Sequence, residues 1–307
     1  MLIVAALGGN ALLQRGEAPT VEAQRRNLAT AAAALAEIAR QNRIVVTHGN
    51  GPQIGLLALQ AEAPGIAGRW PMDVLGAETE GMLGYLIEQE LGNALGAEVA
   101  ALLTRVEVDP GDPAFLNPDK PVGPVYDRET AERLANARGW RVGPDGAGWR
   151  RLMPSPMPKR ILELETIRLL VRAGIVVVCG GGGGIPVAIG RGGAAYGVEA
   201  VIDKDRSAAL LAEVLGADVL LMLTDVPAVF IDWNTSHARP IRRASPAHLA
   251  SRSFAPGSMA PKIEAACRFV DRTGGTAGIG ALADAAAILA GAKGTRIEAD
   301  TETMIVG

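Results

Sequence analysis

Residues 175–184 read IVVVCGGGGG, so an apolar run turns directly into five consecutive glycines. A run of apolar, mostly β-branched residues is typical of a parallel strand that is covered on both faces. Glycine lets a backbone turn tightly and approach a ligand closely, and each additional glycine raises the entropy cost of folding. The stretch therefore predicts a buried strand that ends in a turn able to approach a ligand closely, rather than one that only connects two elements.

The same order of apolar run, glycine-rich turn and longer helical stretch recurs along the chain. The expected strands cover 2–7, 44–47, 99–103, 175–179, 219–223, 276–279 and 303–306. The expected helices cover 20–41, 52–59, 77–91, 162–173, 206–215, 261–271 and 283–290. Strands that alternate with helices are typical of an α/β fold around a mostly parallel sheet.

Residues 109–158 interrupt this alternation because they are dense in proline and glycine. Both residue types break long elements, so we expect loops, a short helix near 127–138 and a hairpin around 140–152. We interpret the segment as an appendage on the sheet. For residues 140–153 we expect a surface elaboration without chemistry.

The composition limits the classes of function. The chain has 307 residues, 49% of them hydrophobic, and a net charge of −3 from 30 basic and 33 acidic side chains. Such a chain buries a sizeable core, and the lack of a basic surplus argues against a nucleic-acid partner. Residues 274–292 form the longest weakly apolar stretch, but they contain Asp284 and are mostly alanine and glycine, so no membrane segment is expected.

The cysteines and histidines indicate neither a disulfide framework nor a zinc site. Cys179 and Cys267 lie in apolar or helical contexts, and we expect both to be reduced core residues of a cytoplasmic protein. The first apolar run lacks the positive charges that precede a signal peptide's core. The three histidines show no ligand spacing with either cysteine.

Three expected strands end in glycine with polar partners. These ends are GGN at 8–10, HGNGP at 48–52 and the five glycines at 180–184. In open α/β sheets the ligand crevice lies at the carboxyl ends of the strands, so the three turns should converge on one cleft. Exposed N–H groups at such turns favour anions. Any one of these turns taken alone is more simply a structural connection, so the argument depends on their convergence.

A second cluster is built from lysines. Lys204 lies between Asp203 and Asp205 in VIDKD, Lys262 follows the turn GSMAP, and Lys120 precedes a proline. Compact ammonium groups can follow a moving phosphoryl group, whose transfer depends on positioning and charge neutralisation. The alternative is a solvated surface ion network, and composition alone does not separate the two. Residues 223–227 (LTDVP) are expected either to seat a nucleotide or to cap a turn.

Standard nucleotide fingerprints are absent from the sequence. The chain has no Gly-Lys dipeptide, which excludes a Walker A loop. Residues 278–283 match G-x-G-x-x-A, but they lack a following βαβ unit with an acidic ribose ligand, so we interpret them as a chance match.

Together these motifs resemble the carbamate kinases, a branch of the amino-acid kinase family, over essentially the whole chain. The segments that carry the resemblance are ALGGNAL (6–12), THGNGPQ (47–53), KPVGP (120–124), PSP (154–156), GGGGIPV (181–187), GVEAVIDKD (197–205), LTDV (223–226) and GSMAPK (257–262). The resemblance implies a three-layer α/β/α fold, a homodimer, and the reaction ATP + carbamate ⇌ ADP + carbamoyl phosphate, run toward ATP. It also implies Mg²⁺, held mainly through the nucleotide phosphates.

The resemblance further implies an organisation and a set of residue roles. Residues 1–215 would form an N-terminal lobe with a protruding subdomain at about 119–158, and residues 216–307 a nucleotide-binding lobe. The residues implied to hold the phosphoryl group in transfer are Gly8, Gly9 and Asn10. Those implied to bind carbamate are Gly49, Asn50 and Gly51. Those implied to neutralise the phosphate are Lys120, Lys204 and Lys262, with Asp205 organising the last two. Those implied to line the nucleotide pocket are Thr224, Asp225, Val226, Gly257, Ser258 and Met259.

Two other functions fit the same scaffold. One is a kinase for another small carboxylate, which would need an additional cationic or hydrogen-bonding side chain in the first two glycine turns. The other is a catalytically silent nucleotide-binding subunit, against which the retention of Lys204, Asp205 and Lys262 argues, because a sensor needs no transition-state charge stabilisation. The sequence leaves open whether Asp203 or Asp205 organises the lysines, and we expect Asp205.

Overall fold

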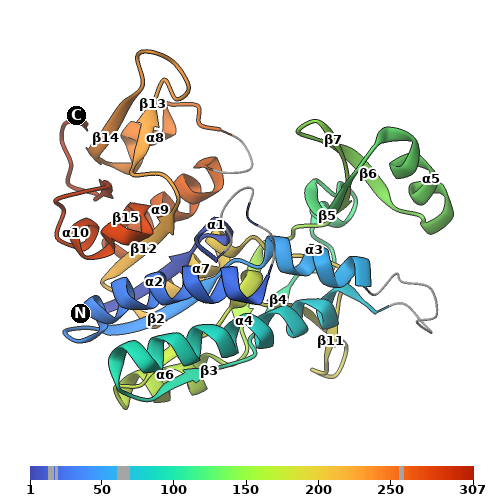
Figure 1. Cartoon of the computed structure of the whole chain (residues 1–307), viewed down its shortest axis with the longest axis horizontal. Helices are drawn as coiled ribbons and strands as arrows, with labels where there is room; N and C mark the ends of the chain where they lie inside the picture. The colour runs from blue at the N-terminus through green and yellow to red at the C-terminus, as the bar shows by residue number, and fades with distance from the viewer. Residues whose placement is uncertain (13–16, 18–19, 61–69, 256–258) are drawn as a thin grey trace.

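The computed structural model describes residues 1–12, 17, 20–60, 70–255 and 259–307 (Figure 1). A large, mostly parallel sheet forms its centre, in the order β13-β14-β16-β15-β12-β1-β2-β9-β3, with β17 paired to β14. The mutually parallel strands are β1 (Leu2–Leu7), β2 (Arg43–His48), β3 (Val99–Ala101), β9 (Val176–Val178), β12 (Val219–Thr224) and β15 (Thr276–Ala281). Beyond β15 lie β13 (Val229–Ile231), β14 (Arg239–Ala244), β16 (Thr295–Ile297) and β17 (Ile305–Val306).

Strand β1 shows why this sheet is covered on both faces. All of its residues are buried. Leu2, Val4 and Ala6 pack into the core on one face, and the residues between them pack into the core on the other. Because successive side chains of a strand point to opposite faces, only a fully apolar strand can lie between two helical layers.

Helices cover both faces and complete a three-layer α/β/α fold, as the resemblance implied. One core contains side chains of α6 (Leu164–Arg172), α7 (Lys204–Leu215) and α9 (Met259–Thr273). The other contains side chains of α2 (Val21–Ala39), α4 (Met72–Leu95) and α10 (Ala285–Leu289). The remaining helices are α1 (Gly9–Leu12), α3 (Gly51–Gln60) and α8 (Pro246–Ala250), and 3₁₀ turns span Pro113–Phe115, Gly181–Gly183 and Leu282–Asp284.

Local sequence signals account for several helix ends. Thr20 caps α2, since its side chain accepts a hydrogen bond from the N–H of Ala23. Helix α4 is longer than the predicted 77–91 and ends at Gly96, whose φ of 67° is the left-handed conformation that favours glycine. Among the described residues, none of the helices has both the length and the apolarity to cross a bilayer.

The region expected to consist of loops with a helix and a hairpin contains more strand than predicted. Strands β5 (Lys120–Tyr126), β6 (Arg141–Asp145) and β7 (Gly148–Met153) form a small sheet with α5 (Arg128–Arg138), which projects from the body (Figure 1). Strand β5 accommodates Pro121 and Pro124 because it is an edge strand, where a missing N–H costs no ladder bond. A further sheet joins β4 (Arg105–Val108), β8 (Pro158–Ile161), β10 (Ile185–Ile189) and β11 (Ala195–Gly197).

Candidate active site

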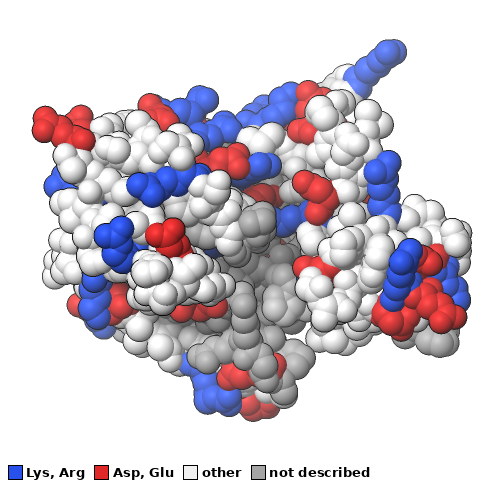
Figure 2. Space-filling view, turned by 90° about the horizontal axis from the view of Figure 1, so that it is seen from above, with Lys and Arg blue, Asp and Glu red and all other residues white. Residues whose placement is uncertain are grey.

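A cleft of about 1300 Å³ opens at the carboxyl ends of the central strands. Gly8 follows β1, Gly49 follows β2 and Gly182 follows β9, and all three line the cleft. The structure thus brings the three glycine turns together at one edge of the sheet. Charged side chains of both signs border the hollow in the middle of the face that Figure 2 shows.

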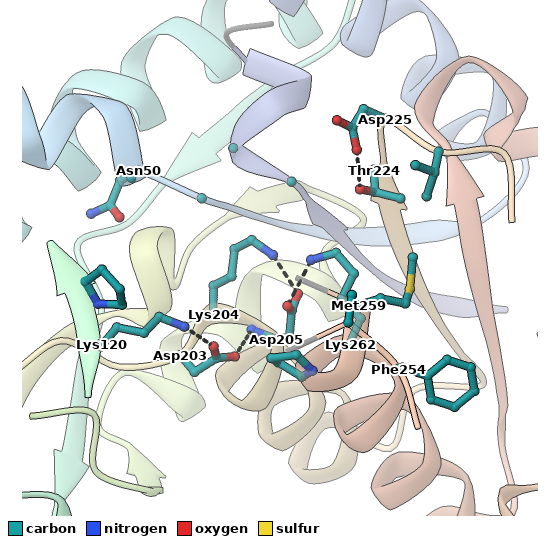
Figure 3. Close-up of a pocket in the computed structure, with 18 of the residues that line it drawn as sticks. Asn50, Lys120, Asp203, Lys204, Asp205, Thr224, Asp225, Phe254, Met259 and Lys262 are labelled. Carbon is teal, nitrogen blue, oxygen red and sulfur yellow. Dashed lines mark hydrogen bonds and ion pairs between the residues drawn. The ribbon is translucent and has the colours of Figure 1, made fainter. Parts of the chain in front are cut away.

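The three lysines singled out from the sequence also line this cleft (Figure 3). The carboxylate of Asp205 lies between two of them, with Oδ1 2.6 Å from Lys204 Nζ and Oδ2 3.0 Å from Lys262 Nζ. Lys120 reaches in from β5 and places its Nζ 2.5 Å from Oδ2 of Asp203. Asp205 therefore contacts two lysines, whereas Asp203 contacts the third.

Asp203 has a second role as the N-cap of α7. Its Oδ1 accepts hydrogen bonds from the N–H groups of Asp205, at 2.9 Å, and Arg206, at 3.2 Å. An aspartate at this position satisfies backbone donors of the first turn and interacts favourably with the helix dipole. The cap places Lys204 and Asp205 in the first turn of the helix, with the Lys204 side chain against the turn at Gly49.

The lysines of the cluster hold its two carboxylates ionised. Burial favours a raised pKa for Asp203, but Lys120 and Lys204 outweigh it and bring that pKa to about 2. Burial likewise opposes ionisation of Asp205, and its two lysines keep its pKa below the ordinary value. Burial and the neighbouring charge of Lys204 lower the pKa of Lys262. Three ammonium groups face two carboxylates, so the cluster retains a positive charge for an anionic ligand.

The glycine turns are close-packed against one another, which explains the residue type at Gly49. A Cβ at this position would lie 2.9 Å from the backbone nitrogen of Gly9 and 3.2 Å from Cδ of Lys204. At Gly51, which lines the cleft, a Cβ would meet no atom of the described residues within 4 Å. Gly49 is therefore required by packing, while the lack of a side chain at Gly51 leaves room for a ligand.

Glu80 of α4 holds the turn at 180–184 through a hydrogen bond. This carboxylate accepts the N–H of Gly181 at 2.8 Å and the N–H of Thr104 at 3.0 Å. Burial raises the pKa of Glu80 to about 7, against the opposing effect of these two hydrogen bonds. Gly182 has a φ of 67°, and a Cβ there would lie 2.2 Å from Nδ2 of Asn50. The backbone of this turn therefore packs directly against the side-chain amide of Asn50.

The other end of the cleft combines polar side chains with apolar and aromatic ones. Its lining includes Thr224, Asp225, Val226 and Met259, which sequence reasoning assigned to a nucleotide, together with Phe230, Trp233 and Phe254, which it missed. The rings of Phe230 and Trp233 have centroids 5.0 Å apart. The two rings are tilted by 56° to one another, and the face of an aromatic ring of this kind suits a nucleobase. Gly257 and Ser258 lie outside the described residues, as does the side chain of Asn10, whose backbone belongs to α1.

Three further side chains at or beside the cleft were not identified from the sequence. Arg150 of β7 lines the cleft, although we expected residues 140–153 to lack chemistry. Thr79 and Glu80 contact Asn50 and Gly181 from α4, and no local pattern marks them. The one signal in the sequence is that Thr79 and Glu80 are polar residues within a helix whose core-facing side chains are otherwise apolar. Both side chains are buried, and buried polar groups need hydrogen-bond partners.

The described residues of the cleft do not form a carboxylate cage for a cation. Among the described residues, no group of three or more histidine, cysteine, aspartate or glutamate side chains could hold a metal ion. Asp203 and Asp205 are engaged by lysines and backbone N–H groups. This donor set fits a divalent cation only if the phosphates of a bound nucleotide supply most of its ligands.

Comparison with known proteins identifies the family. A model of the amino acid kinase family matches residues 1–279. The chain belongs to the amino acid kinase family. Within this family it is 52% identical to a carbamate kinase of Haemophilus influenzae over 304 residues, which is 98% of each chain. It is 54% identical to a carbamate kinase of Rhizobium meliloti, over 97% of this chain and 93% of the relative.

A solved structure of the same family agrees in fold over nearly the whole length. The carbamate kinase from Giardia lamblia bound to AMP-PNP superposes with a TM-score of 0.90 at 37% identity. The match covers 97% of this chain and 98% of that one. The similarity therefore includes the projecting sheet as well as the central layers.

Proposed function

We propose that the chain catalyses reversible phosphoryl transfer between ATP and carbamate, and that it works in the direction of ATP formation. The observation that carries the proposal is the cluster in which Asp205 holds Lys204 and Lys262 next to the glycine turns. Carbamoyl phosphate is a mixed anhydride, so transfer of its phosphoryl group to ADP is favoured. Relatives about half identical over nearly the full length are carbamate kinases.

The chemistry needs no nucleophile from the protein. A carbamate oxygen and the terminal oxygen of ADP lie in line on either side of the phosphorus, and negative charge spreads over the equatorial oxygens. Lys204 and Lys262 neutralise that charge, and Asp205 keeps both ammonium groups in place. Lys120 adds a third positive charge from the projecting sheet. Preorganised charges of this kind stabilise the transition state without reorganisation at the moment of reaction.

The glycine turns supply backbone contacts as well. Gly8, Gly9 and Asn10 hold the transferring phosphoryl group, and Gly49, Asn50 and Gly51 hold carbamate. A small planar anion offers few contacts, so N–H groups that come close are more useful than long side chains. The nucleotide lies against Thr224, Asp225, Val226, Gly257, Ser258 and Met259. Mg²⁺, bound mainly through the nucleotide phosphates, supplies further charge neutralisation.

This assignment divides the chain into two lobes. Residues 1–215, with the subdomain at about 119–158, bind carbamate and the phosphoryl group, and residues 216–307 bind the nucleotide. The strand order supports the division, because β12 to β17 all lie on one side of β1 in the large sheet. Transfer then takes place where the two lobes meet, at the ends of β1 and β12.

We further propose that the protein is a homodimer and that it is located in the cytoplasm. An apolar surface near the edge strand β3 supports a homodimer: Met82 and Tyr85 of α4 are 38% and 54% exposed, and Leu103 is 54% exposed. Exposed apolar groups that gather on one face mark interaction sites. Light scattering on the purified protein tests this, and a monomer would refute it. Both cysteines are unpaired, which supports a reducing, cytoplasmic environment.

A coupled assay tests the reaction. Carbamoyl phosphate and Mg-ADP are supplied, and ATP formation is followed through hexokinase and glucose-6-phosphate dehydrogenase. The matched control is Lys204→Ala, which removes one charge of the cluster. ATP formation no faster than in the control would refute the proposal. Binding of ADP without turnover would indicate a silent nucleotide-binding subunit, and faster use of another acyl phosphate would indicate a kinase for a different carboxylate.

A further inference from the structure

Thr79 of α4 is fully buried and contacts the side chain of Asn50. Its Oγ1 lies 2.8 Å from Nδ2 of Asn50 and 2.8 Å from the carbonyl oxygen of Gly76, one turn earlier on the same helix. Asn50 itself lies between β2 and α3 and lines the cleft. One hydroxyl therefore connects the long helix α4 with a residue of the proposed carbamate site.

The hydrogen-bond inventory of this hydroxyl sets the orientation of the Asn50 amide. A threonine hydroxyl has a single hydrogen, and a carbonyl oxygen such as that of Gly76 can only accept. The hydrogen of Thr79 is thus committed to Gly76, so the hydroxyl can only accept from Asn50. The amide must then present its N–H₂ to Thr79, and its oxygen Oδ1 is left on the other side.

A second contact prevents the amide from turning away. The backbone of Gly182 lies against the amide, close enough that a Cβ at this position would be 2.5 Å from Cγ of Asn50. Glu80, the residue after Thr79, holds the adjacent Gly181 by accepting its N–H. Two consecutive residues of α4 therefore fix the Asn50 amide, one directly and one through the glycine turn.

The orientation leaves an acceptor on the cleft side. In Figure 3 the amide oxygen of Asn50 lies on the side of Lys120 and Lys204, and the nitrogen points away from them. Within the described part of the chain, no donor is hydrogen-bonded to Oδ1. Carbamate differs from acetate in carrying an amino group in place of a methyl group, and only the amino group can donate a hydrogen bond to this oxygen.

We propose that Thr79 is a positioning residue that holds the Asn50 amide so that Oδ1 accepts an N–H of the substrate's amino group, and that the pair thereby selects carbamate over carboxylates without an N–H. The proposal rests on the proposed function and adds the origin of its substrate preference. A site built around a hydrogen bond rejects an analogue that leaves one of its polar groups unpaired.

The test compares two acyl phosphates in the wild type and in two variants. Carbamoyl phosphate and acetyl phosphate are supplied separately with Mg-ADP, and kcat/KM is measured for each. Thr79→Val keeps the shape of the side chain but removes the hydroxyl, and Thr79→Ser keeps the hydroxyl. Where acetyl phosphate turns over too slowly, its inhibition constant against carbamoyl phosphate replaces kcat/KM.

We expect the preference for carbamoyl phosphate to fall about tenfold or more in Thr79→Val, and to stay within about twofold of the wild type in Thr79→Ser. An equal loss with both substrates in Thr79→Val, or an unchanged preference, would overturn the inference, since a merely structural role affects both alike. Binding of Mg-ADP by calorimetry verifies that the variant is folded. If it is not, Thr79→Cys, whose sulfur is a weak acceptor, takes its place.

The outcomes also separate this inference from the proposed function. A wild type that forms ATP from carbamoyl phosphate, together with an unchanged preference in Thr79→Val, would refute only the role of Thr79. A wild type that forms no ATP from carbamoyl phosphate would refute the proposed function, and the inference would fail with it.

Discussion

Glu80 makes the stability of this protein depend on pH in a direction that is unusual for a carboxylate. The side chain is 3% exposed, and burial raises its pKa to about 7 from an ordinary value of 4.5. Hydrogen bonds from the N–H groups of Thr104 and Gly181 oppose this shift without cancelling it. The folded protein therefore retains a proton on Glu80 at pH values where the unfolded chain has released it.

The difference between the pKa of Glu80 in the folded and in the unfolded state sets the sign and the size of the change in the free energy of unfolding with pH. Between pH 4.5 and about 7 the folded state binds more protons than the unfolded state, so the free energy of unfolding falls as the pH rises. The contribution is fully present below pH 4.5 and is lost as the pH passes about 7. At about 1.4 kcal/mol for each pKa unit, the shift corresponds to roughly 3 kcal/mol.

Glu80→Gln isolates this contribution because glutamine has a similar shape and does not titrate. Urea unfolding of both proteins between pH 4.5 and 8 gives the stability difference, wild type minus variant, at each pH. We expect that difference to fall by about 3 kcal/mol across the range. His48, whose pKa burial lowers to about 4, changes stability in the opposite direction, but it is present in both proteins and cancels. Parallel curves for the two proteins would refute the reasoning.

Three further predictions concern the cleft. Asp205→Asn leaves without a carboxylate two lysines whose side chains are only 17% and 11% exposed, so we expect it to cost about 3–5 kcal/mol and to abolish turnover. Asp203→Asn can still cap α7 and should cost less. Melting temperatures and kcat measure both effects, and equal losses in the two variants would contradict the prediction. Gly51→Ala should keep the melting temperature and raise KM, while Gly49→Ala should lower the melting temperature, and the reverse order would refute the packing argument. Burial raises the pKa of the Cys267 thiol to about 11, and neither cysteine lines the cleft; iodoacetamide at neutral pH should therefore leave turnover unchanged, and rapid inactivation would show otherwise.

Much of the fold can be predicted from the chain because its signals are local. The run at 2–7 is apolar throughout, and it forms a strand buried on both faces. Thr20 precedes a helical pattern, and it caps a helix. The edge strand β5 could not be predicted in the same way, because two prolines argue against a strand unless its neighbours leave that edge unpaired.

In the candidate site, too, some features are marked by local sequence and others depend on the tertiary structure. The sequence alone was enough to single out the glycine turns and the three lysines that line the cleft, since glycine at the strand ends and a lysine between two aspartates are properties of short segments. Only the tertiary structure decided that Lys120 meets Asp203 across 83 residues and that Glu80 holds Gly181 across 101. The contact of Lys262 with Asp205 across 57 residues was expected from the family resemblance, not from any local pattern. Local patterns record which faces of an element are apolar, but the partner of a buried charge depends on how the sheet orders its strands. That order is set by packing of the whole chain.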